Sequence, residues 1–533
     1  MDEKDLRRMD TGARNRYECF FSKLKEFERE LGVYIAKHQH LYLWGAGVIG
    51  KRVKRYLEVL GYSVDGFLIT SKTDVNVFCE GIPILTLNEI DDKDNIGIIL
   101  SLSSKHQQEV LVHLHSKNID DIFAITSEYY DLIHISQRML EDSFLEDYRS
   151  YFVPAIRCED IELNRWKNIL LICIENIGDI IMYLPFVREL RRNCSGGVKI
   201  TAVAQPAVKY ILDLCPYVDK TVVYDPQIHL GNDLQEAAQK SLSFAEKNLR
   251  SEKYDVVFLQ GWYNIHVESL FMAMFSKSAM RIGFSESNMP AKALMNKNFD
   301  KFLSVAVKSK SVMHEVERNL QLLKELGGKI YSDEIDFWIE SNDIENAELL
   351  LSGIPSCADK QLVAVVPYAN DPRRMWDKNN YLSLMEQVLV KYSRVVLLVL
   401  GGRETEEIGI MLEKKLPAGR VLNLAGKTSL GGVAAVLKKC DLYIGCNTGL
   451  THIAAAWKVP VVEIICHPVG GDLLEYSSPA RYSAWKTKNV VVRPQKPLPG
   501  CGATCYAREP HCINQITVDE VMQAVAEIDV LNT

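Results

Sequence analysis

One carboxylate in the sequence has the setting of a catalytic base. Asn168 to Ile174 is an apolar run typical of a strand that is covered on both faces. A turn with Gly178 and Asp179 follows, and after it apolar residues recur at helical spacing. Because ligands of open α/β sheets bind at the carboxyl ends of strands, we expect Asp179 to face a cleft. The alternative is that Asp179 only caps the following helix.

Three polar clusters in the last third of the chain have the chemistry to bind a nucleoside diphosphate. They follow three predicted strands and contain Asn370, Arg373 and Arg374 in YANDPRRMW, Glu404 and Glu406 in GGRETEE, and Asn447, Thr448, Gly449, Leu450 and His452 in NTGLTH. Arginines carry fixed positive charge, and a helix N-terminus presents backbone N–H groups to an anion. Each cluster alone also has a structural explanation, such as a solvated arginine, a glycine turn or a packed histidine. Their coincidence at successive strand ends favours a binding site.

A further candidate is the Gly-rich turn WGAGVIGK, with Gly45, Gly47 and Gly50. Its place between a predicted strand and a predicted helix matches the dinucleotide-binding fingerprint. That fingerprint needs an acid at the end of the second strand, where this chain has Thr70 and Ser71. The sequence therefore argues against bound NAD. An NAD-dependent sugar-modifying enzyme is kept as an alternative function.

Alternating strands and helices must position these residues, and they predict an α/β fold with parallel sheets. We expect an amphipathic N-terminal helix, a small Rossmann-like accessory domain, a helical linker, a second Rossmann-like unit, a hinge and a third Rossmann-like unit, at 1–37, 38–127, 128–166, 167–341, 342–360 and 361–533. Two such units joined by a hinge enclose a cleft, the architecture called GT-B among glycosyltransferases. Fold alone would not establish activity. The first helix has a polar face of mixed charge, so we expect it to pack on a neighbouring domain.

Composition excludes several classes of protein. The 533 residues are 47% hydrophobic and 25% charged with a formal charge of −7, so no basic field attracts nucleic acid. No apolar run approaches the roughly 18 residues of a membrane span, and the start MDEKDLRRMD lacks a signal-peptide core. We therefore expect a cytoplasmic protein without a transmembrane segment, and leave open a peripheral contact at the inner face of the cell membrane.

From residue 167 to about 525 the chain resembles glycosyltransferase family 9, whose best-known members are the ADP-heptose:lipopolysaccharide heptosyltransferases. The resemblance rests on motifs that appear in the family's order: NILLICIENIGDIIMYLPFVRELRR, RIGF from Arg281, HEVERNLQLLKELG from His314, NLAGKTSL from Asn423 and CNTGLTHIAAA from Cys446. It implies an inverting, single-displacement transfer from a nucleoside-diphosphate sugar, ADP-heptose in the family. The acceptor is a hydroxyl of a glycan, a glycolipid or a protein, and catalysis requires no cofactor.

The resemblance also implies roles for individual residues. Asp179 is similar to the family's base and Arg374 to its phosphate-contacting basic residue, which is usually Lys. The remaining residues of the donor site are implied to be Asn370, Glu404 or Glu406 at the ribose, Lys427, Asn447, the diphosphate turn Thr448 to Leu450, and His452. The family usually has Asp where this chain has Asn447, at a position expected to touch the donor sugar. The donor sugar therefore stays open between a heptose and a hexose.

Two parts of the chain have no role in that transfer. The accessory domain is open to nucleotide binding, docking or homo-oligomerisation. Cys501, Cys505 and Cys512 lie within twelve residues in CGATCYAREPHC, and with His511 or a distant cysteine they predict a structural zinc or iron site. Reduced thiols with a labile disulfide are the alternative. A non-catalytic binding protein that keeps the transferase shell is the second alternative function, and Asp179 argues against it.

Overall fold

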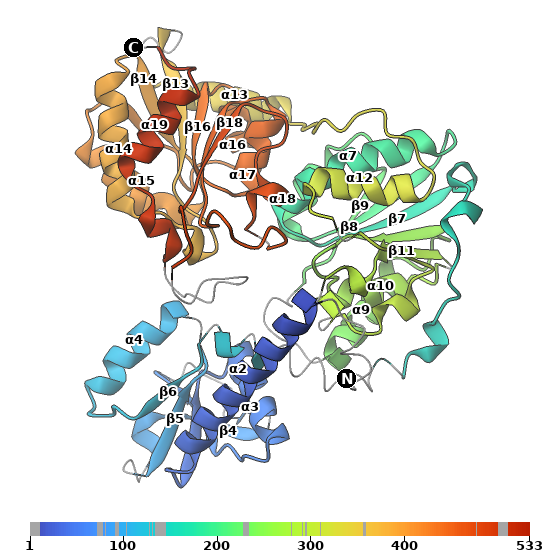
Figure 1. The fold of residues 1–533 in the computed structure, drawn as a ribbon, viewed down its shortest axis with the longest axis vertical. Helices are drawn as coiled ribbons and strands as arrows, with labels where there is room; N and C mark the ends of the chain where they lie inside the picture. The colour runs from blue at the N-terminus through green and yellow to red at the C-terminus, as the bar shows by residue number, and fades with distance from the viewer. Residues whose placement is uncertain are drawn as a thin grey trace.

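The computed structural model describes residues 11–532, except 72–77, 80, 91–94, 103, 127, 131, 134–144, 146, 227–233, 279, 290–291, 294–295, 310, 355–358, 476 and 499–509. The described residues form three lobes, each built around a six-stranded sheet (Figure 1). Helices connect the strands, and nearly every strand pair is parallel. The predicted α/β fold is therefore confirmed.

The first lobe has the strand order β3-β4-β2-β1-β5-β6. Its strands are β1 (His40–Trp44), β2 (Gly66–Ile69), β3 (Phe78–Cys79), β4 (Ile82–Thr86), β5 (Ile96–Leu100) and β6 (Ile122–Ala124), and its helices are α2 (Thr11–Ile35), α3 (Val48–Val59) and α4 (Ser104–His115). Phe27 and Leu31 of α2 are fully buried in the core of this lobe. The prediction that the first helix packs on a neighbouring domain is confirmed.

The predicted helical linker agrees with the structure only in part: residues 128–130, 132–133 and 145 are helical, but the stretch after residue 147 is not one α-helix. Its described residues after 147 form three short 3-10 helices, separated by extended backbone, at Arg149–Tyr151, Cys158–Asp160 and Leu163–Arg165. Its aromatic residues pack on two different lobes: Tyr129 and Tyr130 pack on the first lobe, and the rings of Phe152 and Phe302 of the second lobe meet edge to face at 4.8 Å. In this segment, aromatic residues pack one by one on the lobes, so their spacing does not reflect one face of a continuous helix.

The second lobe has the strand order β12-β11-β10-β7-β8-β9, all parallel. Its strands are β7 (Asn168–Cys173), β8 (Lys199–Ala204), β9 (Lys220–Val223), β10 (Val256–Leu259), β11 (Met280–Phe284) and β12 (Val305–Val307), and its main helices are α7 (Ile177–Asn193), α8 (Lys209–Asp213), α9 (Leu234–Asn248), α10 (Val267–Phe275) and α12 (Glu315–Glu325). The chain builds outward from β7 to β9 and then returns to add β10 on the other side of β7. The strand order therefore reverses between β7 and β10.

The third lobe repeats this plan in the order β15-β14-β13-β16-β17-β18. Its strands are β13 (Gln361–Val366), β14 (Val395–Val399), β15 (Val421–Asn423), β16 (Leu442–Cys446), β17 (Val461–Ile464) and β18 (Asn489–Val492), and its helices are α13 (Ser341–Leu351), α14 (Lys378–Lys391), α15 (Glu406–Lys415), α16 (Leu430–Leu437), α17 (Gly449–Ala456), α18 (Pro479–Tyr482) and α19 (Val518–Glu527). Its order reverses between β13 and β16.

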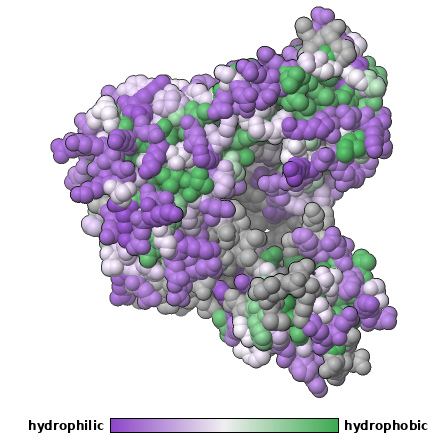
Figure 2. Space-filling model, turned by 180° about the vertical axis from the view of Figure 1, so that it is seen from behind, coloured by the Kyte–Doolittle hydropathy of each residue, from purple (hydrophilic) through white to green (hydrophobic). Residues whose placement is uncertain are grey.

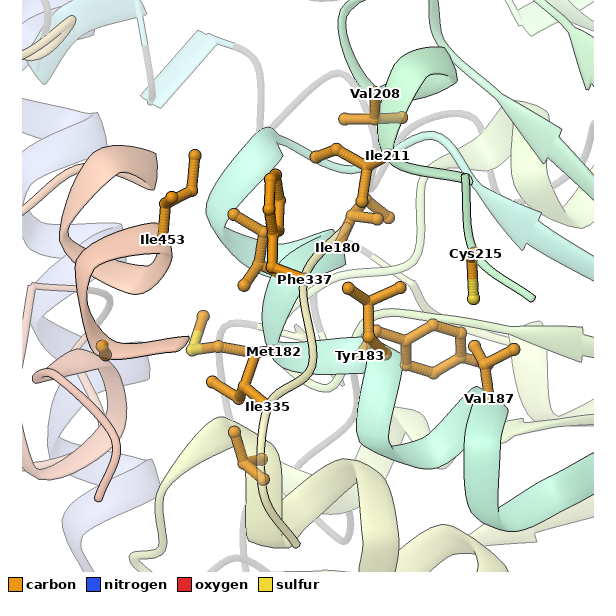
Figure 3. Close-up of a cluster of buried hydrophobic side chains, with 14 of the residues drawn as sticks. Ile180, Met182, Tyr183, Val187, Val208, Ile211, Cys215, Ile335, Phe337 and Ile453 are labelled. Atoms are coloured by element: carbon orange, nitrogen blue, oxygen red, sulfur yellow. The ribbon is translucent and has the colours of Figure 1, made fainter. Parts of the chain in front are cut away.

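The connection between the second and third lobes lies earlier than the predicted hinge. Helix α13, which we expected to start the hinge, packs on α16 and so belongs to the third lobe. The crossing segment is therefore the irregular stretch 327–340, which follows α12. Figure 3 shows two of its side chains, Ile335 and Phe337, lying between α7 of the second lobe and α17 of the third. One apolar core runs through both lobes as a result.

On the face shown in Figure 2, the described surface is mostly hydrophilic and is hollowed between the lobes. Among the described residues, no helix is both long enough and apolar enough to cross a membrane.

Candidate active site

A cavity of about 800 Å³ lies between the second and third lobes, at the reversal points of both sheets. Its walls include the segments that follow β7 and β10 in one lobe, residues 175–179 and 260–264, and those that follow β13 and β16 in the other, residues 368–371 and 447–450. Open α/β sheets bind ligands at such reversal points, because the loops diverge there and leave a crevice. Two crevices face each other here and form one site.

Asp179 lines this cavity. The structure excludes the alternative that Asp179 is the helix cap, because α7 begins at Ile177 with Asn176 as its N-cap. Asp179 is half-buried, and no described side chain forms a hydrogen bond or ion pair with its carboxylate. The amide of Gln260 donates to its backbone carbonyl at 3.1 Å and ties the turn to β10. The carboxylate is therefore held in place by the backbone and remains available to a ligand.

The surroundings of Asp179 raise its pKa to about 7. Burial is the largest cause, because it penalises the charged form. The carboxylates of Glu175 and Glu315 raise the pKa further, while Arg481 and Arg374 lower it. A carboxylate whose pKa lies near neutral pH is matched to general-base work.

Glu175 forms an ion pair with His266 on the wall of the second lobe. The carboxylate of Glu175 is 3.2 Å from Nε2 of His266, and both side chains line the cavity. The negative charge of Glu175 raises the pKa of His266 and outweighs the burial that lowers it. Neither residue was predicted from the sequence, although Glu175 lies four positions before Asp179.

The two adjacent arginines of YANDPRRMW have different surroundings. Arg373 donates to both carboxylate oxygens of Asp371, at 3.0 Å from Nε and 2.9 Å from Nη2. Arg374 lines the cavity, and its Nε is 4.0 Å from the same carboxylate. Of the pair, Arg374 is the one placed to meet an anionic ligand, as the resemblance implies.

The N-terminus of α17 also lines the cavity, and it is partly occupied by its own cap. Thr448 is the N-cap: its backbone N–H donates to Thr451 Oγ1 at 3.0 Å, and its hydroxyl accepts from Leu450 N at 3.3 Å. Of the three N–H groups predicted to face a diphosphate, two are therefore already satisfied. Within the described part of the chain, the N–H of Gly449 has no such partner, and it lies at the positive end of the helix dipole.

The other predicted donor-site residues divide into two groups. Asn370, Glu404, Asn447 and His452 line the cavity. Glu406 and Lys427 are not among its lining residues, and their roles stay predictions: Glu406 is the first residue of α15, and Lys427 donates to the backbone carbonyl of Asn423 at 2.8 Å. In the ribose-binding alternative the structure therefore favours Glu404, the one of the two acids that lies in the wall.

His452 is buried where the two helix N-termini of the site meet. A Cβ on Gly178 of α7 would lie 3.0 Å from the His452 ring, and a Cβ on Gly449 would lie 2.7 Å from Ile177. Burial lowers the pKa of His452 to about 3, so the imidazole is neutral. Two glycines and a neutral ring thus allow α7 and α17 to approach closely across the domain boundary.

A charged cluster between the lobes was missed in the sequence. Glu315 at the start of α12 accepts from Arg318 at 3.2 Å and from Arg481 of the third lobe at 2.8 Å. The two guanidinium groups lie 3.7 and 4.7 Å from the ring centroid of Trp262. Glu315 and Arg481 are 166 positions apart, so no local pattern could have paired them.

Two predicted sites contribute no described residue to the walls of this cavity. Gly45 and Gly47 lie between β1 and α3 in the first lobe, and Gly50 lies in the first turn of α3. A Cβ on Gly50 would lie 1.8 Å from the carbonyl oxygen of Gly45, so this close approach requires glycine. Cys501 and Cys505 lie outside the described residues. Cys512 is buried, and its sulfur accepts from Leu498 N at 3.4 Å. The described residues contain no group of three or more metal-ligating side chains.

Comparison with known proteins identifies this architecture. Residues 243–506 match Glycosyltransferase family 9 (heptosyltransferase). The chain carries a glycosyltransferase family 9 domain. The resemblance inferred from the motifs is confirmed, and the protein is a glycosyltransferase with a GT-B fold and an additional N-terminal Rossmann-like domain.

Two curated relatives and one solved structure describe the extent of the similarity. Lipooligosaccharide heptosyltransferase 2 of Haemophilus influenzae is 24% identical over 310 residues, 56% of this chain and 82% of that protein. Lipopolysaccharide heptosyltransferase 3 of Escherichia coli K12 is 27% identical over 159 residues, 28% of this chain and 43% of that protein. The crystal structure of a family 9 glycosyltransferase from Veillonella parvula covers 70% of this chain and 98% of its own, with a TM-score of 0.55 and 16% identity. This chain therefore shares the fold of that family 9 glycosyltransferase over 70% of its length.

Proposed function

We propose that this glycosyltransferase moves a heptose from ADP-heptose to a hydroxyl of a glycan, glycolipid or protein acceptor, with inversion at the anomeric carbon. The observation that carries the proposal is Asp179, a carboxylate with a pKa of about 7, in a cavity whose opposite wall offers Arg374 and the N-terminus of α17. The named curated relatives are heptosyltransferases, which supports the choice of sugar.

In this proposal the diphosphate binds to the third lobe. Arg374 and the N–H of Gly449 lie in the same wall and supply positive charge and a positive helix end. Glu404, which follows β14 and lines the cavity, accepts hydrogen bonds from the ribose in this proposal. The sugar then projects from the distal phosphate toward Asp179 of the second lobe.

The transfer is a single displacement. Asp179 takes the proton of the acceptor hydroxyl as its oxygen bonds to the anomeric carbon, and base catalysis of this kind contributes about 10² to 10⁴-fold. The bond between the anomeric carbon and the diphosphate oxygen breaks, and its electron pair leaves with ADP. Arg374 and the end of α17 stabilise the charge that develops on the leaving group. The step therefore assigns no role to a metal ion, and we expect activity to persist in the presence of a chelator.

The test is release of nucleoside diphosphate from a panel of nucleotide sugars, including ADP-heptose and an ADP-hexose, by the native protein and by Asp179→Asn. We expect ADP-heptose to be consumed and the nearly isosteric variant to lose at least about 10²-fold in kcat. The variant keeps its affinity for ADP, because Asp179 faces the acceptor and not the diphosphate. Near-native turnover by Asp179→Asn contradicts the assignment of the base.

A further inference from the structure

Asn447 has a fixed orientation in the wall of the cavity. It follows β16, precedes the N-cap of α17, and is half-buried among the lining residues. Its Nδ2 donates to the backbone carbonyl of Tyr482 at 2.7 Å and to Oε2 of Glu463 at 2.9 Å. A carbonyl can only accept a hydrogen bond, so the NH₂ group and not the oxygen must face Tyr482. The geometry thus decides which end of the amide points inward.

The amide oxygen of Asn447 is left for a ligand. A primary amide has two N–H donors, and both are used by Tyr482 and Glu463. No described donor reaches Oδ1. Since Asn447 lines the cavity and its nitrogen is committed to the protein, Oδ1 is the polar atom that this residue can offer there.

Glu463 holds this arrangement from inside the third lobe. It lies on β17, its side chain is fully buried, and it does not line the cavity. Its Oε2 accepts from Asn447, while its Oε1 accepts from the backbone N–H of Ala484 and from Nδ2 of Asn489 at 3.4 Å. Burial raises the pKa of Glu463, and these three hydrogen bonds oppose that rise because each partner donates to the ionised form. The buried carboxylate is thus satisfied by three donors, one of which is Asn447.

The hydrogen bond between Asn447 and Glu463 also explains why residue 447 is an asparagine. An aspartate at 447 would place a carboxylate oxygen against the carbonyl of Tyr482 and the carboxylate of Glu463, and like charges at that distance cannot both ionise. The residue that fits beside a buried Glu463 is the neutral amide. The identity of residue 447 and the identity of residue 463 are therefore coupled.

We propose that Glu463 is a positioning residue that fixes Asn447 so that its uncharged amide oxygen accepts a hydrogen bond from a hydroxyl of the donor's sugar. This inference rests on the proposed function, which places the diphosphate at the adjacent N-terminus of α17 and the sugar between that helix and Asp179. Glu463 itself touches no ligand. The donor subsite thus recognises the sugar through a neutral acceptor whose direction is set by a buried charge.

The experiment compares native protein, Glu463→Gln, Asn447→Asp, the double exchange Asn447→Asp/Glu463→Gln and Asn489→Ala. For each, the Kd of ADP is measured by calorimetry, and KM and kcat by ADP release from ADP-heptose or from the nucleotide sugar that the native protein consumes. Asn489→Ala is the matched control, because it removes a donor to Glu463 on the side away from Asn447.

We expect Glu463→Gln to raise the donor KM about tenfold, the effect of one lost hydrogen bond, with the Kd of ADP unchanged within about twofold. In this variant the new side-chain amide keeps its oxygen toward Ala484, so its NH₂ group meets the NH₂ group of Asn447. The double exchange restores a donor–acceptor pair with the direction reversed. It therefore has a lower donor KM than Asn447→Asp alone, and Asn489→Ala stays within about twofold of native.

Three outcomes overturn the inference. In the first, the donor KM of Glu463→Gln is unchanged. In the second, the ADP affinity of Glu463→Gln falls as much as its donor affinity, which indicates a general effect on the fold. In the third, the effects of the two single exchanges on the donor KM simply add in the double variant. Turnover by the native protein tests the proposed function separately from the variants. If the native protein binds ADP but consumes no nucleotide sugar, the proposed function fails, and the inference fails with it.

Discussion

At the scale of single residues, the pKa of Asp179 gives the transfer a distinctive pH dependence. A base acts in its ionised form, so with a pKa of about 7 the value of kcat/KM rises from about pH 6 to 8 and levels off above that range. We expect Glu175→Gln to move this acidic limb to lower pH, because the charge of Glu175 raises the pKa of Asp179. The measurement is the pH profile of kcat/KM for both proteins.

Glu268 supplies the control for this profile. It is fully buried on α10, and burial raises its pKa to about 7 as well. The largest shifts in the pKa of Asp179 come from its burial and from other charged groups. We therefore expect Glu268→Gln to leave the position of the limb unchanged. If the limb moved in Glu268→Gln and not in Glu175→Gln, the titrating group would be Glu268 and not Asp179.

The residues that the sequence predicted are those with a local signature. Asp179 follows an apolar strand and a glycine, and Asn447 to His452 follow another strand, so their place at strand ends could be inferred. The partners that set their chemistry could not. Glu463 is 16 positions from Asn447, and Arg481 is 166 from Glu315. Such pairs depend on how strands and lobes pack, which periodicity does not encode.

At the scale of elements, two helix N-termini meet across the cleft and require glycine at their contact. A Cβ on Gly449 would lie 2.7 Å from the side chain of Ile177, so α7 and α17 must separate to admit it. A displacement of about 1 Å at a catalytic centre costs about 10²-fold. We expect Gly449→Ala to lower kcat/KM for ADP-heptose by about one to two orders of magnitude while the protein stays folded.

The matched control is Gly196→Ala, just after α7. A Cβ there meets nothing within 4 Å, and its backbone is not in the left-handed region. Near-native kcat/KM in this variant, together with near-native circular dichroism in both, would attribute the loss to the helix contact. If Gly449→Ala is as active as Gly196→Ala, the close approach of α7 and α17 has no part in the transfer.

The elements themselves were predictable where one physical pattern dominated. Buried parallel strands appear as continuous apolar runs, so the strands of the second and third lobes were found. The predicted linker spans the residues between β6 and β7, but after residue 147 it contains only short 3-10 helices, and the crossing to the third lobe lies before the predicted hinge. Aromatic and apolar residues of these segments pack singly against neighbouring lobes. Phe152 and Phe337 look like helix or loop residues in the sequence, and both are parts of a neighbouring core.

At the scale of the whole molecule, the second and third lobes are joined by ion pairs of two kinds. Glu315 contacts Arg318 and Arg481, whose side chains are both fully buried. Glu334, in the crossing segment 327–340, pairs with Lys458 of the third lobe, with both side chains about half exposed. Water screens the exposed pair and not the buried one. Comparing the free energy of unfolding after changing Glu315 and after changing Glu334 therefore tests how much each kind of pair holds the two lobes together.

We expect Glu315→Gln to lower the free energy of unfolding by about 3 to 5 kcal/mol, because two buried guanidinium groups lose their counter-charge beside Trp262. Glu334→Gln, which breaks an exposed pair between the same lobes, should cost about 0 to 1 kcal/mol. Urea denaturation of both variants measures the difference. Equal costs would show that the buried cluster does not hold the lobes, and the fixed distance between Asp179 and the α17 N-terminus would then have to come from the apolar core that Ile335 and Phe337 complete.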